Sequence, residues 1–177
     1  MIISNCPKTK EELIKFYNDL DKSSAKSDKA MRKLLEASYE TVSETGACSS
    51  RLDEIKVFCK KMGHKKIGAA YCKGLKDYGE KVDSALSYDF EVFSVCCNVC
   101  GINKSDIQVK QIKPEAVEAA CNPIGQALAL NDKKVDFVVK CGFCLGHDLI
   151  FSKTINAPTT TLVVKDRKFK HRTFDIF

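Results

Sequence analysis

Hydrophobic residues recur at intervals of three and four through the first third of the chain, which is the spacing of amphipathic helices. Thr9, followed three residues later by Glu12, forms the capping-box pattern that begins a first helix. The same spacing predicts a second helix over about 27–44 and a third over about 50–62, each ending at a glycine. We therefore predict a helical N-terminal extension over residues 1–63.

The pattern changes near Lys65, where the apolar runs become short. Four such runs predict strands over residues 66–72, 90–96, 135–139 and 159–164. Helical spacing between them predicts helices over about 75–88, 124–130 and 148–153. Strands that alternate with helices imply right-handed crossovers and a parallel sheet. We predict an α/β domain over residues 64–177, a three-layer Rossmann-like or flavodoxin-like parallel sheet on which the N-terminal helices pack.

The connection between the second and third predicted strands has a weaker pattern. Residues 98–113 carry turn signals and no clear periodicity. Pro114 favours the first position of a helix that would run to Ala120. Asn122 precedes a proline and therefore avoids helical geometry, which places Cys121 in a predicted helix break.

The chain has 177 residues and ten cysteines, and the cysteine content is its unusual feature. No apolar run approaches the roughly 20 residues that span a bilayer, so we expect no membrane segment. The first residues lack the pattern of a secretory signal, and we expect a cytoplasmic protein. In a reducing compartment, such cysteine richness favours metal binding or thiol chemistry over a disulfide framework, although cysteine also serves as a small buried hydrophobe.

The formal net charge is +6, with lysines spread beside acidic residues. One basic cluster lies near the C-terminus and comprises Lys165, Arg167, Lys168, Lys170 and Arg172. We interpret it as a solvated terminal segment and do not expect a nucleic-acid partner, because no aromatic residues interleave with glycines as in an RNA-binding sheet. The chain also lacks the phosphate-binding and dinucleotide-binding glycine patterns.

Several cysteines stand where predicted strands end. Cys72 ends the first strand, the Cys96-Cys97 pair ends the second, and Cys144 follows the third. Because the carboxyl ends of parallel strands share one edge, where ligands of open α/β sheets bind, we expect these thiols to converge. Cys121 would fold over the same edge. Cys59 and Cys141 fit buried positions.

Two chemistries suit this set, and the sequence leaves both open. Thiolate and imidazole ligands from Cys72, Cys96, Cys97, Cys121, Cys144 and His147 would hold zinc or an iron–sulfur cluster, with a redox or sensing role. Alternatively, Cys144 would be the nucleophile of a thiol enzyme and His147 its base. Asp148 would then orient the histidine, or it would cap the following helix. A third possibility is a ligand-binding or partner-binding module without catalysis.

The combination of motifs resembles a known family. The segments that carry the resemblance are Lys66-Ile67-Gly68-Ala69-Ala70-Tyr71-Cys72-Lys73-Gly74-Leu75, Phe90-Glu91-Val92-Phe93-Ser94-Val95-Cys96-Cys97, Cys121-Asn122-Pro123-Ile124-Gly125-Gln126-Ala127, Gly142-Phe143-Cys144-Leu145-Gly146-His147-Asp148, Ala157-Pro158-Thr159-Thr160 and Val164-Lys165-Asp166-Arg167. They are similar to domain of unknown function family 1847, uncharacterised cysteine-rich proteins described as predicted metal-binding proteins.

The resemblance implies a cytosolic metal-binding protein. By motif match it extends to Cys72, Cys96, Cys97, Cys121, Cys144, His147 and Asp148. Cys100 and Cys141 have no counterpart in the family pattern. The resemblance therefore favours ligands dispersed over several elements rather than the two local pairs, Cys97-x-x-Cys100 and Cys141-x-x-Cys144.

Overall fold

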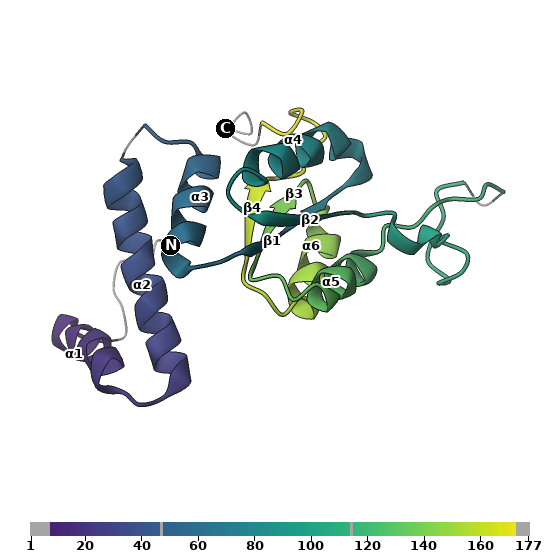
Figure 1. Ribbon diagram of the computed structural model, residues 1–177. Coiled ribbons are helices and arrows are strands. Elements are labelled where there is room, and N and C mark those ends of the chain that lie inside the picture. Colours follow the sequence, from purple (N-terminus) through teal and green to yellow (C-terminus); the bar gives the residue numbers. More distant parts are fainter. Residues whose placement is uncertain (1–7, 47, 114, 173–177) are drawn as a thin grey trace. The chain divides into compact units, whose positions relative to one another are not determined.

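The computed structural model describes residues 8–46, 48–113 and 115–172, and it divides the chain into two compact units, residues 1–63 and 64–177. The first unit is helical and the second contains the sheet (Figure 1). The packing of the N-terminal helices on the sheet domain stays a prediction. No helix in the described ranges is long and apolar enough to cross a bilayer.

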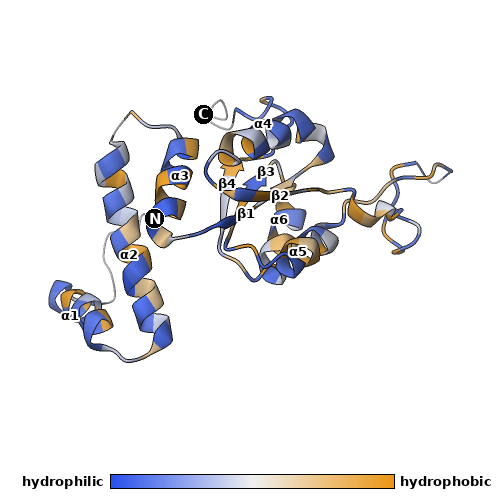
Figure 2. Ribbon diagram, in the orientation of Figure 1, coloured by the Kyte–Doolittle hydropathy of each residue, from blue (hydrophilic) through white to orange (hydrophobic). Residues whose placement is uncertain are grey.

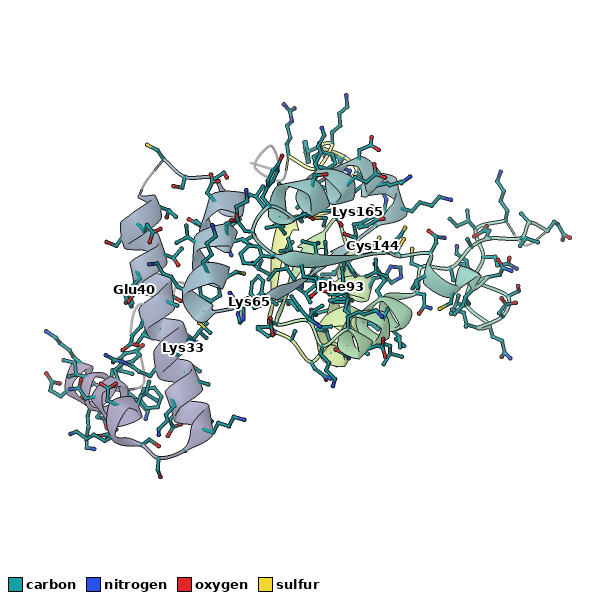
Figure 3. All side chains as sticks on the ribbon, viewed as in Figure 1. Lys33, Glu40, Lys65, Phe93, Cys144 and Lys165 are labelled. Atoms are coloured by element: carbon teal, nitrogen blue, oxygen red, sulfur yellow. The ribbon has the colours of Figure 1, made fainter. Side chains whose placement is uncertain are left out.

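The helical unit forms as its sequence signals indicate. It contains α1 (Lys10–Lys22), α2 (Lys26–Thr45) and α3 (Arg51–Met62). Thr9 and Glu12 make the predicted capping box, in which each side chain bonds the other residue's backbone N–H, at 3.2 and 2.7 Å. Within the unit, Lys33 of α2 donates to the Met62 carbonyl at 2.7 Å, and Lys61 of α3 pairs with Glu40 at 3.5 Å (Figure 3). Cys59 is fully buried, as expected of a core cysteine.

The second unit is an α/β fold with four parallel strands. In chain order its strands are β1 (Lys66–Tyr71), β2 (Glu91–Cys96), β3 (Phe137–Cys141) and β4 (Thr159–Val163). Its helices are α4 (Lys76–Leu86), α5 (Pro123–Asp132) and α6 (Leu145–Thr154), with short 3₁₀ turns η1 (Lys73–Leu75) and η2 (Val99–Gly101). The spatial order is β2-β1-β3-β4, and every neighbouring pair is parallel. The predicted α/β class, with its Rossmann-like or flavodoxin-like layout, is confirmed.

The strand order places the helices in two layers. The chain moves from β1 to β2 on one side and then returns past β1 to β3. Because crossovers are right-handed, this reversal sends α4 to one face of the sheet and α5 and α6 to the other, as Figure 1 shows. The reversal creates a topological switch point between β1 and β3, where ligands of such sheets bind.

The core explains why the central strands are almost wholly apolar. β1 and β3 are covered on both faces and are buried along nearly their whole length, whereas the edge strands β2 and β4 are partly exposed. Helix α5 is coloured mostly hydrophobic in Figure 2, and it approaches β1 so closely that a Cβ at Gly68 would lie 2.9 Å from Leu130 Cδ1. The apolar strands and α5 thus form one core beneath the site.

The helix predicted to begin at Pro114 is corrected by the structure, although Pro114 itself lies outside the described residues. Residues 115–120 are not helical, and Asn103 and Ala119 form an antiparallel bridge. The described residues of the segment 98–120, which connects β2 to α5, are called the arm below. Glu118 stabilises it, because its carboxylate pairs with Lys104 at 2.5 Å and accepts the backbone N–H of Ile112 at 3.1 Å. The backbone of this segment therefore bonds across the arm instead of along a helix axis.

Candidate functional site

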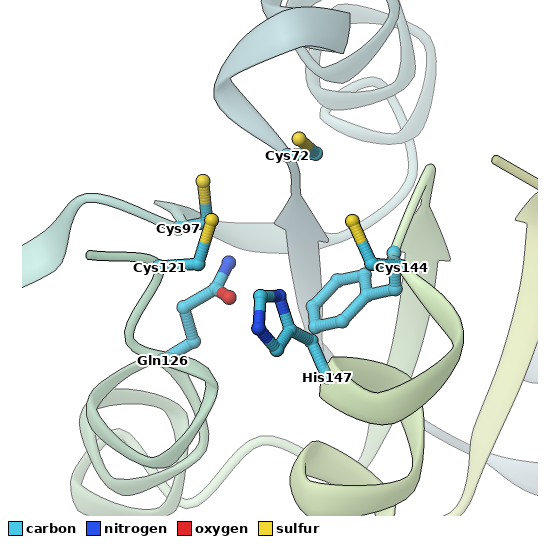
Figure 4. Close-up of a pocket in the computed structure, with 7 residues that line it drawn as sticks. Cys72, Cys97, Cys121, Gln126, Cys144 and His147 are labelled. Carbon is cyan, nitrogen blue, oxygen red and sulfur yellow. The ribbon is translucent and has the colours of Figure 1, made fainter. Parts of the chain in front are cut away.

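Four cysteines and a histidine surround one hollow at the carboxyl edge of the sheet. We call it the cysteine hollow; its lining residues are Cys72, Cys97, Cys121, Gln126, Phe143, Cys144 and His147 (Figure 4). Its cavity volume is about 10 Å³, which is enough for about one water molecule. The hollow as it stands therefore has room for an ion or a water molecule, and a cluster would require its thiols to move apart.

The sheet ladder places the first two thiols side by side. Hydrogen bonding continues beyond the strand ends, with Cys97 N–H donating to the Tyr71 carbonyl at 3.0 Å and Cys72 N–H donating to the Cys141 carbonyl at 3.1 Å. The backbone N–H of Lys73 then donates to Cys97 Sγ at 3.2 Å. The parallel register thus places Cys72 and Cys97, from neighbouring strands, next to each other.

The arm returns Cys121 to the same place. Asn122 N–H donates to the Cys97 carbonyl at 2.7 Å, which holds the returning chain against the end of β2. Asn122 is also the N-cap of α5, where its Oδ1 accepts the Gly125 N–H at 2.7 Å. Cys121 therefore precedes a capped helix start rather than lying in a helix break.

Cys144 and His147 come from the start of α6. Cys144 is the N-cap residue and makes no side-chain capping hydrogen bond, so its thiol points into the hollow (Figure 4). His147 lies in the first turn of the same helix. Phe143 forms a wall and packs edge-on against the buried Phe151, with ring centroids 5.0 Å apart.

Positive charge surrounds these sulfurs. Lys165 Nζ donates to Cys72 Sγ at 2.7 Å, and an Arg167 guanidinium nitrogen donates to Cys144 Sγ at 3.2 Å. Both cations follow β4 and belong to the basic cluster, which we predicted from the sequence to be a solvated terminal segment. Helices α5 and α6 also begin beside the hollow, and helix N-termini favour thiolate over thiol. The site therefore stabilises cysteines in their thiolate form.

The thiols of Cys72 and Cys97 have opposite protonation preferences. The hydrogen bond from Cys97, together with Lys165, lowers the pKa of Cys72 to about 4, although burial opposes this. The same hydrogen bond and burial raise the pKa of Cys97 above its ordinary value. Cys97 also contacts Cys121 through a hydrogen bond. In metal-free protein this pair therefore holds one thiolate and one thiol.

Not every cysteine or acid from the sequence analysis reaches the hollow. Cys96 is partly exposed at the end of β2 and does not line it, because neighbouring strand residues point to opposite faces. Cys100 is exposed on the arm. Cys141 is 1% exposed in β3, and burial raises its pKa to about 11. Each local Cys-x-x-Cys pair thus contributes only one member.

Asp148 neither orients His147 nor caps a helix, the two roles considered for it from the sequence. Its carboxylate pairs with the buried ammonium of Lys140 at 2.5 Å, and Lys140 also donates to Ser152 at 3.1 Å. Helix α6 begins before Asp148, so this residue is not the N-cap. Within the part of the chain that the structure describes, no hydrogen bond joins Asp148 to His147.

The sequence reasoning quoted Gln126 within a segment of the family resemblance but did not predict it as a site residue. It is 1% exposed, and its Nε2 donates to the carbonyls of Tyr71 at 3.1 Å and Val95 at 3.0 Å. Its Oε1 is buried without a partner among the described residues. A lone amide within the apolar run of α5 was a usable signal. Lys165 and Arg167 were identified only as members of the basic cluster and of a segment that carries the family resemblance, and no local signal linked them to the cysteines.

No group of three or more His, Cys, Asp or Glu side chains within residues 8–46, 48–113 and 115–172 is arranged to hold a metal ion. The nine described cysteines are all free of disulfides. The hollow therefore gathers potential ligands around a space without closing them on one point.

Comparison with known proteins identifies relatives of this chain but no activity. The model of the family described as protein of unknown function DUF1847 matches residues 6–162. An uncharacterized protein of Methanocaldococcus jannaschii is 50% identical over 124 residues, which amount to 70% of this chain and 64% of that protein. This chain thus matches less than two thirds of that relative's length. No solved structure matches. On the extent of both matches, the chain belongs to the DUF1847 family, whose function is unknown.

Proposed function

We propose that this protein binds a metal centre in the cysteine hollow, with Cys72, Cys97, Cys121 and Cys144 as its ligands. The observation that carries the proposal is the convergence of four thiols, each from a different chain segment, on one hollow. His147 adds a nitrogen donor at the rim. Burial of four thiols as mere hydrophobes would not require that they face one another.

The donor set fits metals that prefer sulfur. Thiolates with an imidazole suit zinc and iron, whereas an oxygen-rich site would suit magnesium or calcium. Lys165 and Arg167 contribute charge in the right sense, because they stabilise thiolate at Cys72 and Cys144. Metal binding requires deprotonated cysteines, and these contacts lower the free-energy cost of deprotonation.

An iron–sulfur cluster is the better candidate, and zinc is the alternative. A single zinc ion draws four ligands to about 2.3 Å from one point, and no three described side chains are grouped for a lone ion. A cluster is larger than one ion and accepts ligands spread around a space, as four cysteines are here. Such a cluster would supply electron transfer or redox sensing.

The test is purification under anaerobic conditions, followed by analysis of iron, zinc and acid-labile sulfide with an absorption spectrum. We expect stoichiometric iron and sulfide with visible absorption. Cys72→Ser and Cys144→Ser should each lose most of the metal. Cys100→Ser is the matched control, because this exposed cysteine lies outside the hollow and should leave the metal content unchanged. Wild-type protein that takes up neither metal after reconstitution would refute the proposal.

A thiol enzyme is the second candidate, and the geometry favours Cys72 over Cys144 as its nucleophile. Cys72 Sγ lies 2.7 Å from Lys165 Nζ at the end of a central strand, where an activated thiolate is stabilised. Cys144 is engaged by Arg167, and no hydrogen bond joins it to His147 among the described residues. In metal-free protein, brief alkylation followed by peptide mass spectrometry should label Cys72 first. Equal labelling of all accessible cysteines would exclude this candidate.

A further inference from the structure

Cys72 and Cys97 are neighbours across the sheet, at the position that follows the last paired residues of β1 and β2. Tyr71 of β1 pairs with Cys96 of β2, and the next residue on each strand is a cysteine. Neighbouring strands lie about 4.7–4.9 Å apart, and the Cα atoms of a disulfide are separated by roughly 4.4–6.8 Å. The two cysteines are therefore close enough for a disulfide to form with little movement of the backbone.

Gln126 holds the two strand ends at this separation. Its Nε2 donates to the carbonyl of Tyr71 at 3.1 Å and to that of Val95 at 3.0 Å, so that one buried amide bridges β1 and β2 just before the cysteines. The Cys97 N–H adds a hydrogen bond to the Tyr71 carbonyl at 3.0 Å. The backbone on both sides of the pair is therefore held in a fixed frame.

The two sulfurs have different environments. Cys72 is partly exposed to solvent, and its Sγ accepts a hydrogen bond from the Lys165 ammonium at 2.7 Å, a contact that favours thiolate. Cys97 is 5% exposed, its thiol hydrogen-bonds Cys72, and its Sγ accepts the Lys73 N–H at 3.2 Å. An oxidant from solvent therefore meets Cys72 first. An accessible thiolate beside a second, protected thiol is the arrangement of cysteines that oxidise reversibly.

We propose that Cys72 and Cys97 form a dithiol–disulfide couple that hydrogen peroxide oxidises. The Cys72 thiolate attacks one peroxide oxygen, the O–O bond breaks, and hydroxide leaves beside the Lys165 ammonium. The Cys97 thiol then loses its proton and displaces the hydroxyl of the Cys72 sulfenic acid, which forms the S–S bond and releases water. The two sulfurs together lose two electrons, and the peroxide is reduced to one water and one hydroxide. The disulfide adds no atom to the hollow, which has room for about one water.

The couple rests on the reactive Cys72 of the second candidate function, and it requires no metal. The other thiols of the hollow are less suited to reach Cys72. Cys144 is held by Arg167 at 3.2 Å. Cys121 hydrogen-bonds Cys97, and no hydrogen bond joins it to Cys72 among the described residues. Hydrogen peroxide suits the half-buried Cys72 because so small an oxidant needs no pocket.

The test treats reduced, metal-free protein with one equivalent of hydrogen peroxide, blocks the remaining thiols by alkylation in denaturant, and maps disulfides by mass spectrometry of an unreduced tryptic digest. We expect peptide 67–73, which contains Cys72, to be cross-linked through Cys97 to peptide 82–104. Cys97→Ser should lose this cross-link and leave Cys72 as a sulfenic acid, which dimedone traps. Cys96→Ser is the matched control, because this neighbouring cysteine does not line the hollow and its loss should leave the cross-link unchanged.

The wild-type digest tests the couple even where Cys97→Ser does not fold. A disulfide from Cys72 to a different cysteine would overturn the proposal, as would wild-type Cys72 that dimedone labels as strongly as it labels Cys97→Ser. Cys72 that reacts with iodoacetamide but forms no cross-link would overturn the couple and leave the thiol-enzyme candidate in place. Cys72 that reacts with neither reagent would overturn both, whereas metal uptake is measured on separate samples and is independent of either result.

Discussion

Removal of the Lys165 charge should make the Cys72 thiolate less stable in metal-free protein. Lys165→Met deletes the ammonium that donates to Cys72 Sγ at 2.7 Å while keeping most of the side-chain volume. The hydrogen bond from Cys97 is the largest contribution to the lowered pKa, and it remains. The variant should therefore raise the pKa of Cys72 but leave it below that of an ordinary thiol.

The size of the effect follows from the geometry. A hydrogen bond to a charged group contributes about 1.5–3 kcal/mol, which corresponds to roughly a ten- to hundredfold change in the acid dissociation constant. Coulomb's law for unit charges at 2.7 Å gives about 1.5 kcal/mol in water and about 6 kcal/mol at an effective dielectric constant of 20. Cys72 is partly exposed to solvent, so we expect an effect near the lower end of both ranges, about 1.5 kcal/mol.

The assay is the rate of Cys72 alkylation by iodoacetamide as a function of pH, read by peptide mass spectrometry. The wild-type rate should stay level from pH 8 to about pH 5 and fall near the pKa of about 4, since only thiolate reacts. The fall should move to higher pH in Lys165→Met and stay in place in Lys165→Arg. Lys73→Met is the matched control, with the same charge change on the exposed neighbour of Cys72. An unmoved profile in Lys165→Met, or an equal movement in the control, would refute the reasoning.

Three further predictions concern the frame of the site. Gly142→Ala should destabilise the protein by about 2–5 kcal/mol in urea unfolding, because Gly142 has φ +69° and an added Cβ would overlap Leu75; unchanged stability would contradict the description of this turn. Cys141, whose pKa burial raises to about 11, should react with alkylating reagents only after unfolding, and fast native labelling would refute that burial. Burial raises the pKa of Asp136, but two hydrogen bonds that its carboxylate accepts from the backbone N–H groups of Lys65 and Lys66 lower it more. Asp136 therefore contributes to folding stability at neutral pH, and this contribution is lost as pH falls through the lowered pKa. Asp136→Asn should cost roughly 1–2 kcal/mol at pH 7 and much less near pH 2, and equal losses at both would disprove the ionic origin.

Most of the fold was predictable because its signals are local. Short apolar runs separated by helical spacing mark each strand of β1 to β4 within one or two residues. The failure at residues 115–120 has a physical cause, since Glu118 bonds the amides and the lysine of its own arm. Long-range pairing outweighed the local helical preference that Pro114 suggested. No local pattern reports such a contact.

The site was predictable only in outline. Strand ends and a predicted helix break suggested six residues, and the structure brings all of them except Cys96 to one hollow; the six are Cys72, Cys96, Cys97, Cys121, Cys144 and His147. The choice between Cys96 and Cys97 depended on which face each strand residue presents. Lys165 and Arg167, which stabilise the thiolates, lie 93 and 23 residues along the chain from the cysteines they contact. Gln126 is close to Cys121 in sequence, but no local pattern showed that it would line the hollow.

Periodicity and the order of strands along the chain are local properties, and they were enough to identify the parallel α/β class, the helical extension and the edge of the sheet at which the thiols end. Tertiary structure alone decided which thiols face one another. That choice depends on the register of β1 against β2 and on the bond from Asn122 to Cys97, which draws the arm back. It also decided that Lys165 would be a partner of Cys72, because a solvated lysine and a lysine beside a thiolate have the same local sequence.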